Sequence, residues 1–214
     1  MKIKPSLPLF PLTGLALFPQ IRLPLRVFEP RYVQMVQDAW DNHQKIGLIQ
    51  PHVPQNDNQP DLTQPPTHPD LYAIGGMGSI LDLREHEGFW LLLLKGESRF
   101  EVIRELPLNP GGYREVEYTT AAYAHDTTDT PDPLRVAQLK ESVEAQGVTL
   151  GTSFEVGFSD TELVHALAGS LPMSPAERQA LLEAPTINDR LDLLNRMLHM
   201  QPDMVSHPKA AWVN

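Results

Sequence analysis

Histidine, serine and acidic side chains carry out much of protein chemistry, and this chain contains all three without the spacing that a catalytic or metal site needs. The eight histidines include no H-E-x-x-H zinc motif. No G-x-x-x-x-G-K-S/T loop is present to hold nucleotide phosphates, and no G-x-S-x-G turn is present to expose a nucleophilic serine. The absence of cysteine excludes disulfides, thiolate metal sites and cysteine nucleophiles. We therefore predict no catalytic residue, no metal site and no cofactor, with a hydrolase assembled only in space as a less favoured alternative.

The charge of the chain is negative and unevenly distributed. Its 214 residues carry 17 Lys and Arg against 27 Asp and Glu, a formal net charge of -10. Residues 1–124 hold 11 basic against 14 acidic residues, and residues 125–214 hold 6 against 13. Nucleic acids and anionic membranes are bound chiefly by clustered Lys and Arg, and the sequence has no such cluster, so both are disfavoured as partners. No run approaches the ~20 apolar residues that span a bilayer, and we expect a cytoplasmic protein.

The elements that would position a site fall into two regions, of which the first is rich in strands. Short apolar runs alternate there with turn residues, at residues 46–50, 71–83, 89–95, 99–106 and 113–123. This spacing predicts a compact barrel or sandwich. One helix interrupts the strands, because Pro30 suits a first helical position and apolar residues from Tyr32 to Trp40 follow at helical spacing. We expect that helix to plug or flank the barrel.

Prolines mark a loop and several strands in the first region. Residues 51–69 hold six prolines among Gln, Asn, Asp and Thr, and this composition predicts a surface loop whose functional role is open. Pro8, Pro11, Pro19 and Pro24 are expected to keep strand edges from pairing with other chains.

The second region, after a linker at residues 126–133, is predicted to be helical. Asp132 is a plausible cap for a first helix that begins at Pro133. Three further helix starts carry a hydroxyl cap with an acidic residue three positions on: Ser159 with Glu162, Ser174 with Glu177, and Thr186 with Asp189. Apolar residues at helical spacing follow each cap. The sequence thus predicts a β-barrel domain at residues 1–124 and a helical domain at residues 125–214.

Five ordered blocks of residues resemble a known family: residues 7–12, 17–32, 74–80, 96–102, and 181–183 followed by 190–191. Together they are similar to the N-terminal, substrate-binding domain of Lon proteases, in the stand-alone form that lacks the ATPase and peptidase domains. The resemblance implies an α+β fold, with a pseudouridine-synthase-and-archaeosine-transglycosylase-like (PUA-like) β-barrel, one inserted helix and a small C-terminal helical bundle. Position 20 is Gln where family members often have Gly, so the chain departs from the family at a tight turn.

Four residues are candidates for recognition or for its support. Arg31 and Tyr32 open the predicted helix, where we expect Tyr32 to pack inward and Arg31 to be exposed. Exposed Arg and aromatic side chains are enriched at binding hot spots, so both are candidate partner-binding residues. Glu29 ends the densest family block and Arg99 precedes a strand. We expect Glu29 and Arg99 to form a structural ion pair that fixes the helix to the barrel, in preference to contacting a ligand.

The leading functional hypothesis is a non-catalytic module that binds proteins or peptides, as the resemblance to the Lon domain implies. RNA binding is the first alternative, because PUA-like barrels are associated with RNA-modifying enzymes, although the acidic charge argues against it. A small-ligand pocket inside the barrel is the second alternative. The residues alone leave open the identity of the partner, the oligomeric state and any link to proteolysis.

Overall fold

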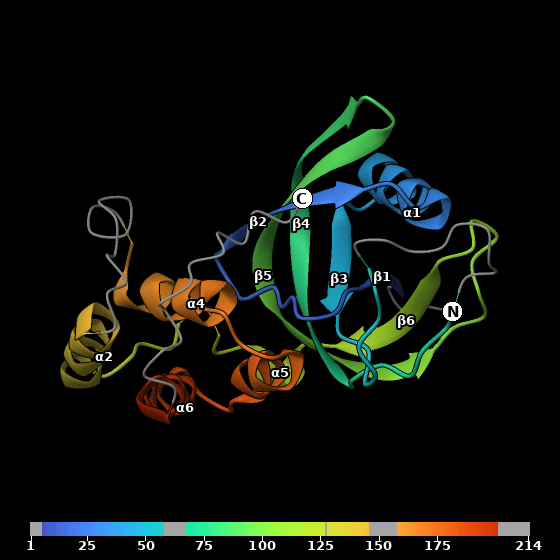
Figure 1. Ribbon diagram of the computed structural model, residues 1–214. Coiled ribbons are helices and arrows are strands. Elements are labelled where there is room, and N and C mark those ends of the chain that lie inside the picture. Colours follow the sequence, from blue (N-terminus) through green and yellow to red (C-terminus); the bar gives the residue numbers. More distant parts are fainter. Residues whose placement is uncertain (1–5, 58–66, 127, 146–157, 201–214) are drawn as a thin grey trace.

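The computed structural model describes residues 6–57, 67–126, 128–145 and 158–200 (Figure 1). The strands are β1 (Ser6–Pro11), β2 (Arg22–Val27), β3 (Lys45–Ile49), β4 (Ile74–His86), β5 (Phe89–Glu105) and β6 (Arg114–Thr119). The helices are α1 (Pro30–Asp41), α2 (Pro133–Ala145), α4 (Asp160–Ser170), α5 (Pro175–Glu183) and α6 (Ile187–Met200), with a short 3-10 turn, η1 (Ala121–Tyr123). Strands therefore come first and most helices follow them, which confirms the predicted α+β class.

All the strands belong to one sheet that closes on itself. Their order is β2-β5-β4-β3-β1-β6, and β6 also pairs with β5. Neighbouring strands are antiparallel except β1 and β3, which are parallel. The pairing of β6 with β5 completes a ring from which only β2 is excluded. Among the described strands, β2 has a free edge along its whole length, and β4 has one beyond Ser79, where its pairing with β3 ends.

Strand β5 joins the ring to β2 because it is unusually long. The two strands predicted at residues 89–95 and 99–106 are a single strand of 17 residues. Its first half pairs with β2, and its second half pairs with β6 from Glu101 onward. Gly96 lies between the halves, where a Cβ atom would come within 2.0 Å of the Phe18 carbonyl oxygen. Beside Gly96 the register shifts between Met77 and Gly78 of β4, so that Glu97 is an extra residue of β5, and a bulge of this kind bends its strand.

Helix α1 begins at Pro30, as predicted, and flanks the sheet (Figure 1). Its buried face consists of Tyr32, Met35, Val36 and Ala39. These side chains share a core with inward-facing residues of the strands, including Leu25 and Val27 of β2 and Leu92 and Leu94 of β5. One face of the β2–β5 pair is therefore buried against α1 and against inward-facing side chains of the other strands.

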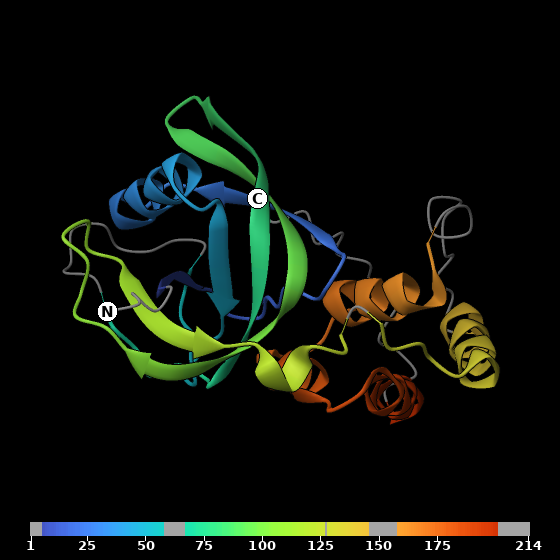
Figure 2. The same ribbon diagram turned by 180° about the vertical axis from the view of Figure 1, so that it is seen from behind.

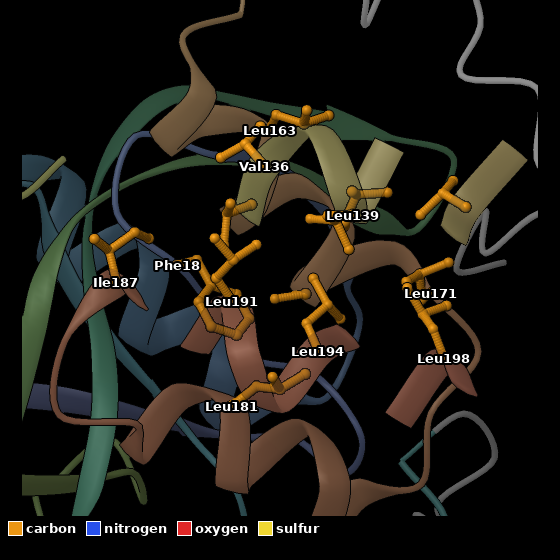
Figure 3. Close-up of a cluster of buried hydrophobic side chains, with 14 of the residues drawn as sticks. Phe18, Val136, Leu139, Leu163, Leu171, Leu181, Ile187, Leu191, Leu194 and Leu198 are labelled. Carbon is orange, nitrogen blue, oxygen red and sulfur yellow. The ribbon is translucent and has the colours of Figure 1, made fainter. Parts of the chain in front are cut away.

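A second core lies among α2, α4, α5 and α6 (Figure 3). Leucines dominate it, and Phe18 enters it from the segment between β1 and β2. Both views show these four helices together on one side of the sheet, with the tip of the β4–β5 hairpin projecting away from them (Figures 1 and 2). Phe18 therefore ties the N-terminal segment into the helical core.

The predicted helix caps are confirmed. Each cap pairs a hydroxyl side chain with an acidic residue, in reciprocal hydrogen bonds to backbone N–H groups: Ser159 with Glu162, Ser174 with Glu177, and Thr186 with Asp189. These bonds satisfy donors that the first turn of a helix leaves free. Short-range sequence signals thus fix the starts of α4, α5 and α6.

The predicted role of the strand prolines stays a prediction for Pro8 and Pro11. Both lie in β1, where the register gives Pro8 a partner in β6 only and Pro11 a partner in β3 only. Pro24 lies in β2, which has a free edge, and proline there supplies no backbone donor to an incoming strand. The expectation therefore remains for Pro24.

The turn before β2 forms although it has Gln where the family often has Gly. Gln20 takes a left-handed backbone conformation, with φ of 69°. Its N–H donates a hydrogen bond to the Gly96 carbonyl oxygen at 2.8 Å. Pro19 lies in this turn and not in a strand. The hydrogen bond holds the turn against the strain that a Cβ atom adds at positive φ.

The proline-rich loop is anchored at both ends, and its residues 58–66 lie outside the described residues. Pro51 and Leu71 form an isolated antiparallel bridge where the loop leaves and rejoins the sheet. Arg31 Nη1 donates to the Thr67 carbonyl oxygen at 3.2 Å, and Arg114 Nη1 donates to the Pro69 carbonyl oxygen at 2.6 Å. Most described side chains of the loop are exposed or half-buried, in agreement with the predicted surface loop.

Candidate functional site

The two predicted partner-binding residues lie against the protein. Tyr32 is 7% exposed, and its ring packs on Phe10 with centroids 4.7 Å apart. The Arg31 guanidinium lies 4.5 Å from the Tyr32 ring centroid, and the Arg31 side chain is 15% exposed. The expectation of an exposed Arg31 is therefore wrong. A partner-binding role for Arg31 and Tyr32 stays a prediction that this geometry does not favour.

Glu29 and Arg99 do not form the predicted ion pair. Glu29 Oε2 lies 3.0 Å from Arg31 Nη2, whereas Arg99 Nη2 lies 2.6 Å from Asp126 Oδ1. Burial raises the pKa of the Glu29 carboxyl, an effect that the Arg31 charge opposes. The two side chains are directed to different parts of the fold. Glu29 stands at the start of α1, whereas the Arg99 side chain reaches the end of α5.

Arg99 joins the sheet to the helices. It is 1% exposed, and it donates hydrogen bonds to the carbonyl oxygens of Leu182, Ala184 and Pro185 at 3.0, 2.6 and 3.1 Å. Burial acts to raise the pKa of the Asp126 carboxyl, but the hydrogen bonds and charge of Arg99 outweigh it and hold that pKa below its ordinary value. Arg99 is therefore buried in contacts that join the sheet to the helices, and its carboxylate partner is Asp126 instead of the predicted Glu29.

A buried histidine and arginine form a second polar contact between the two cores. His165 Nδ1 lies 2.9 Å from the Pro19 carbonyl oxygen, and its Nε2 lies 2.7 Å from Arg190 Nη1. Arg190 Nε donates to the Leu181 carbonyl oxygen at 2.8 Å. Within the part of the chain that the structure describes, the hydrogen-bond partners of His165 are the Pro19 carbonyl and Arg190, neither of which is a nucleophile, and no group of three or more His, Asp or Glu could hold a metal ion. This arrangement is suited to packing and not to acid–base catalysis.

Several exposed apolar side chains lie on the projecting part of the sheet, which we call the arm: β2, residues 79–86 of β4 and residues 89–95 of β5. The register pairs Arg22 with Lys95, Pro24 with Leu93, and Arg26 with Leu91. Because side chains alternate along a strand, these residues and Phe89 share one side of the arm, opposite α1. We call this side the arm face.

Apolar side chains run along the middle of the arm face. Leu91 is 42% exposed, Pro24 is exposed, and Leu93 and Phe89 are half-buried. Leu81, which is also 42% exposed, is the extra residue of a bulge between Ile80 and Asp82. A contiguous apolar strip of this kind on a soluble surface typically marks an interaction site.

Cationic side chains border the apolar strip. The Arg26 guanidinium lies 4.1 Å from the Phe89 ring centroid. Arg22 and Lys95 are exposed and, among the described residues, have no acidic partner within 4.0 Å. The register with β4 also places Asp82 and Arg84, which form an ion pair, opposite Leu93 and Leu91 on this face. The arm face thus combines exposed aliphatic surface with the unpaired positive charge of Arg22, Arg26 and Lys95, on a chain that is acidic as a whole.

The sequence did not single out the arm face. Residues 89–94 form a continuous apolar run, which is typical of a strand buried on both sides. In the structure α1 and the sheet interior cover one side only, so Leu91 and Leu93 lie on the open side. The neighbouring strand β2 did carry a signal for one exposed face. In it, Arg22, Pro24 and Arg26 alternate with apolar residues.

The fold and the match of the sequence to known proteins agree. The family described as "ATP-dependent protease La (LON) substrate-binding domain" matches residues 6–200. The chain belongs to this family. Lon protease 2 of Desulfotalea psychrophila is 24% identical to it over 196 residues, which cover 89% of this chain and 24% of that protein. The chain therefore spans about a quarter of the length of this Lon relative.

Solved Lon domains share the same fold. A Lon N-terminal domain protein from Xanthomonas campestris is 26% identical, with a TM-score of 0.59 over 89% of this chain and 96% of that chain. The N-terminal domain of a Mycobacterium avium complex Lon protease has a TM-score of 0.59 at 16% identity, over 91% of this chain and 98% of that chain. Within the described residues, no helix combines the length and apolar character needed to cross a membrane.

Proposed function

We propose that this Lon substrate-binding domain is a non-catalytic recognition module that binds protein or peptide segments through the arm face. The observation that carries the proposal is the exposed apolar strip of Leu91, Leu93 and Pro24 on a sheet whose other side is buried. Covering such a strip removes apolar surface from water, which is the main driving force of protein association.

The construction of the arm favours binding through side chains. Leu25 and Leu92 anchor its inner side in the core that includes α1, so the outer side chains project from a fixed backbone. The free edge of β2 is a poor template for an added strand, because Pro24 supplies no N–H at its centre. At the β2 edge, a partner segment would therefore lie across the arm face instead of extending the sheet.

We also propose the finer architecture. The closed sheet is taken as a PUA-like barrel at residues 1–124, and the helices as a bundle at residues 125–214. Separate clusters of buried apolar residues in the sheet and among the helices support this division. The insertion of Phe18 into the helical core and the bonds of Arg99 to α5 support rigid attachment of the two parts.

The two alternative functions have less support. RNA binding is disfavoured by the formal net charge of -10, since phosphate contacts need many cations. A ligand site inside the closed sheet is disfavoured because buried side chains fill it, among them Leu7, Leu9 and Phe100.

Site-specific photocrosslinking tests the proposal. A benzophenone amino acid in place of Leu91 should crosslink to unfolded casein, whereas the same replacement at Ile103 should not. Ile103 is a matched control, because it is exposed and lies on the same strand outside the arm. Leu91→Ser should weaken casein binding about tenfold, as expected for one truncated apolar contact, and Ile103→Ser should not.

Equal crosslinking from both positions would show that casein does not select the arm face. Hydrolysis of casein or ATP by the purified protein, abolished by one substitution, would refute the non-catalytic part of the proposal. Circular dichroism of each variant checks that its fold is intact.

A further inference from the structure

We propose that the arm face selects segments in which apolar residues are flanked by Asp or Glu, an inference that rests on the proposed peptide-binding function. The apolar strip would bind the apolar residues, and Arg22, Arg26 and Lys95 would bind the flanking carboxylates. The partner is thus an acidic and apolar polypeptide segment.

The first observation is the distribution of free cations. Three exposed Lys and Arg residues in the described part of the chain have an acidic partner within 4.0 Å: Arg84 with Asp82, Arg104 with Glu117 and Lys140 with Asp160. The described exposed cations that lack one are Arg22, Arg26, Lys95 and Arg196. All but Arg196 lie on the arm face. Unpaired positive charge is therefore concentrated beside the apolar strip.

The second observation is that two of these cations face each other. Arg22 of β2 is the direct cross-strand partner of Lys95 of β5. Like charges in directly opposite positions destabilise a sheet. A carboxylate placed between them would convert this repulsion into attraction, so the pair is unfavourable for folding alone and favourable for binding an anion.

The apolar strip decides between a peptide and a nucleic acid. Single-stranded nucleic acids are held by aromatic side chains on which bases stack, together with a positive groove. The middle of the arm face is aliphatic, at Pro24, Leu91 and Leu93, and the face of the Phe89 ring is occupied by the Arg26 guanidinium. Aliphatic side chains beside cations complement a peptide that carries both apolar and acidic residues.

Three labelled peptides test the selectivity by fluorescence anisotropy. They share one Leu- and Phe-containing core and differ only in flanking residues, which are Glu, Gln or Lys. The Glu peptide should bind at least about tenfold more tightly than the Lys peptide, as complementary charge predicts. Raising the salt concentration from 50 mM to 500 mM should reduce that difference, because salt screens exposed charges.

Lys95→Glu separates binding from folding. It replaces a like-charge pair by an unlike pair with Arg22, so the variant should be at least as stable as the parent while losing the preference for the Glu peptide. Arg196→Glu is the matched control, since it makes the same change of charge at an exposed and unpaired arginine on α6. Arg196→Glu should keep the preference.

The outcomes distinguish this inference from the proposed function. Equal binding of all three peptides, with Leu91→Ser still weakening it, would overturn the acidic selectivity and leave the proposed function standing. Failure of every peptide and of casein to bind would overturn both. Tighter, strongly salt-dependent binding of an oligouridylate than of the Glu peptide would overturn the inference in favour of a nucleic acid.

Discussion

Lowering the pH from 7 to 5 should destabilise this protein through one buried side chain, His165. The residue is 1% exposed, so no solvent is available to a charged ring. Its Nδ1 must carry the proton that is donated to the Pro19 carbonyl oxygen at 2.9 Å. Its Nε2, 2.7 Å from Arg190 Nη1, must accept, because a guanidinium can only donate. A second proton on Nε2 would face a donor and a positive charge.

The magnitude follows from the pKa. Burial, and secondly the Arg190 charge, lower the pKa of His165 from 6.5 to about 3. Between those values the unfolded chain binds a proton that the folded chain does not, so stability is complete above pH 6.5 and falls as the pH decreases. The loss is about 1.4 kcal/mol per pH unit, which gives about 2 kcal/mol between pH 6.5 and pH 5.

Urea unfolding at pH 7, 6 and 5 measures this loss, with His165→Gln as the comparison. The Gln amide can donate to Pro19 and accept from Arg190, but it does not titrate. The parent should therefore lose about 2 kcal/mol more than His165→Gln over this pH range. Burial also lowers the pKa of His43, and its contribution cancels because both proteins retain it.

An equal loss of stability between pH 7 and pH 5 in the parent and in His165→Gln would refute the conclusion that His165 is neutral in the folded protein. The control is His199→Gln, which changes an exposed histidine at the end of α6 and should retain the full pH dependence of the parent. If His165→Gln does not fold, ring ¹⁵N chemical shifts of the parent decide the question. They should show a neutral imidazole protonated at Nδ1 at pH 5.

Three further predictions concern stability and use chemical or thermal unfolding. Arg99→Met should cost about 3–5 kcal/mol, because it leaves the Asp126 carboxylate, 3% exposed, without its partner; adding Asp126→Asn should recover part of the loss, and no recovery would contradict this explanation. Gln20→Gly should stabilise the protein by about 1 kcal/mol, since it removes the strain of a φ of 69°, and an unchanged or lower melting temperature would show that the turn is not strained. Gly76→Ala should cost more than about 3 kcal/mol, because its Cβ would lie 1.9 Å from a backbone carbonyl oxygen. Gly88→Ala should cost only about 1 kcal/mol, because Gly88 has a φ of 88° but open space around it. Equal losses for the two glycine variants would argue against that close approach.

Local features of the fold were predictable because their causes lie within a few residues. Pro30 set the start of α1, and hydroxyl and acidic pairs set the starts of α4, α5 and α6. The family blocks identified the Lon domain for the same reason, since each block is short and keeps its order. The predicted boundary between residues 95 and 99 was wrong, because Gly96 and Ser98 pair with β4 and continue β5 as one strand.

The partners of buried charges were not predictable. Arg99 could be expected to need a carboxylate, but nothing local distinguishes Glu29 from Asp126, and both are distant in the chain. The packing of α5 against the sheet brings three carbonyl oxygens to the guanidinium, and the turn after η1 brings Asp126. The packing of α1 against the sheet buries Tyr32 and half-buries Arg31, which removes both from the exposed surface.

The sequence by itself determined the class of the fold, the helix starts, the family and the absence of known catalytic motifs, all of which depend on residue types and short spacing. Only the tertiary structure decided where recognition could occur. The run at residues 89–94 is apolar on both sides, and its outer side chains became a candidate surface because α1 covers the inner side and no described element covers the other. Exposure depends on what the rest of the chain covers, and no local pattern contains that information.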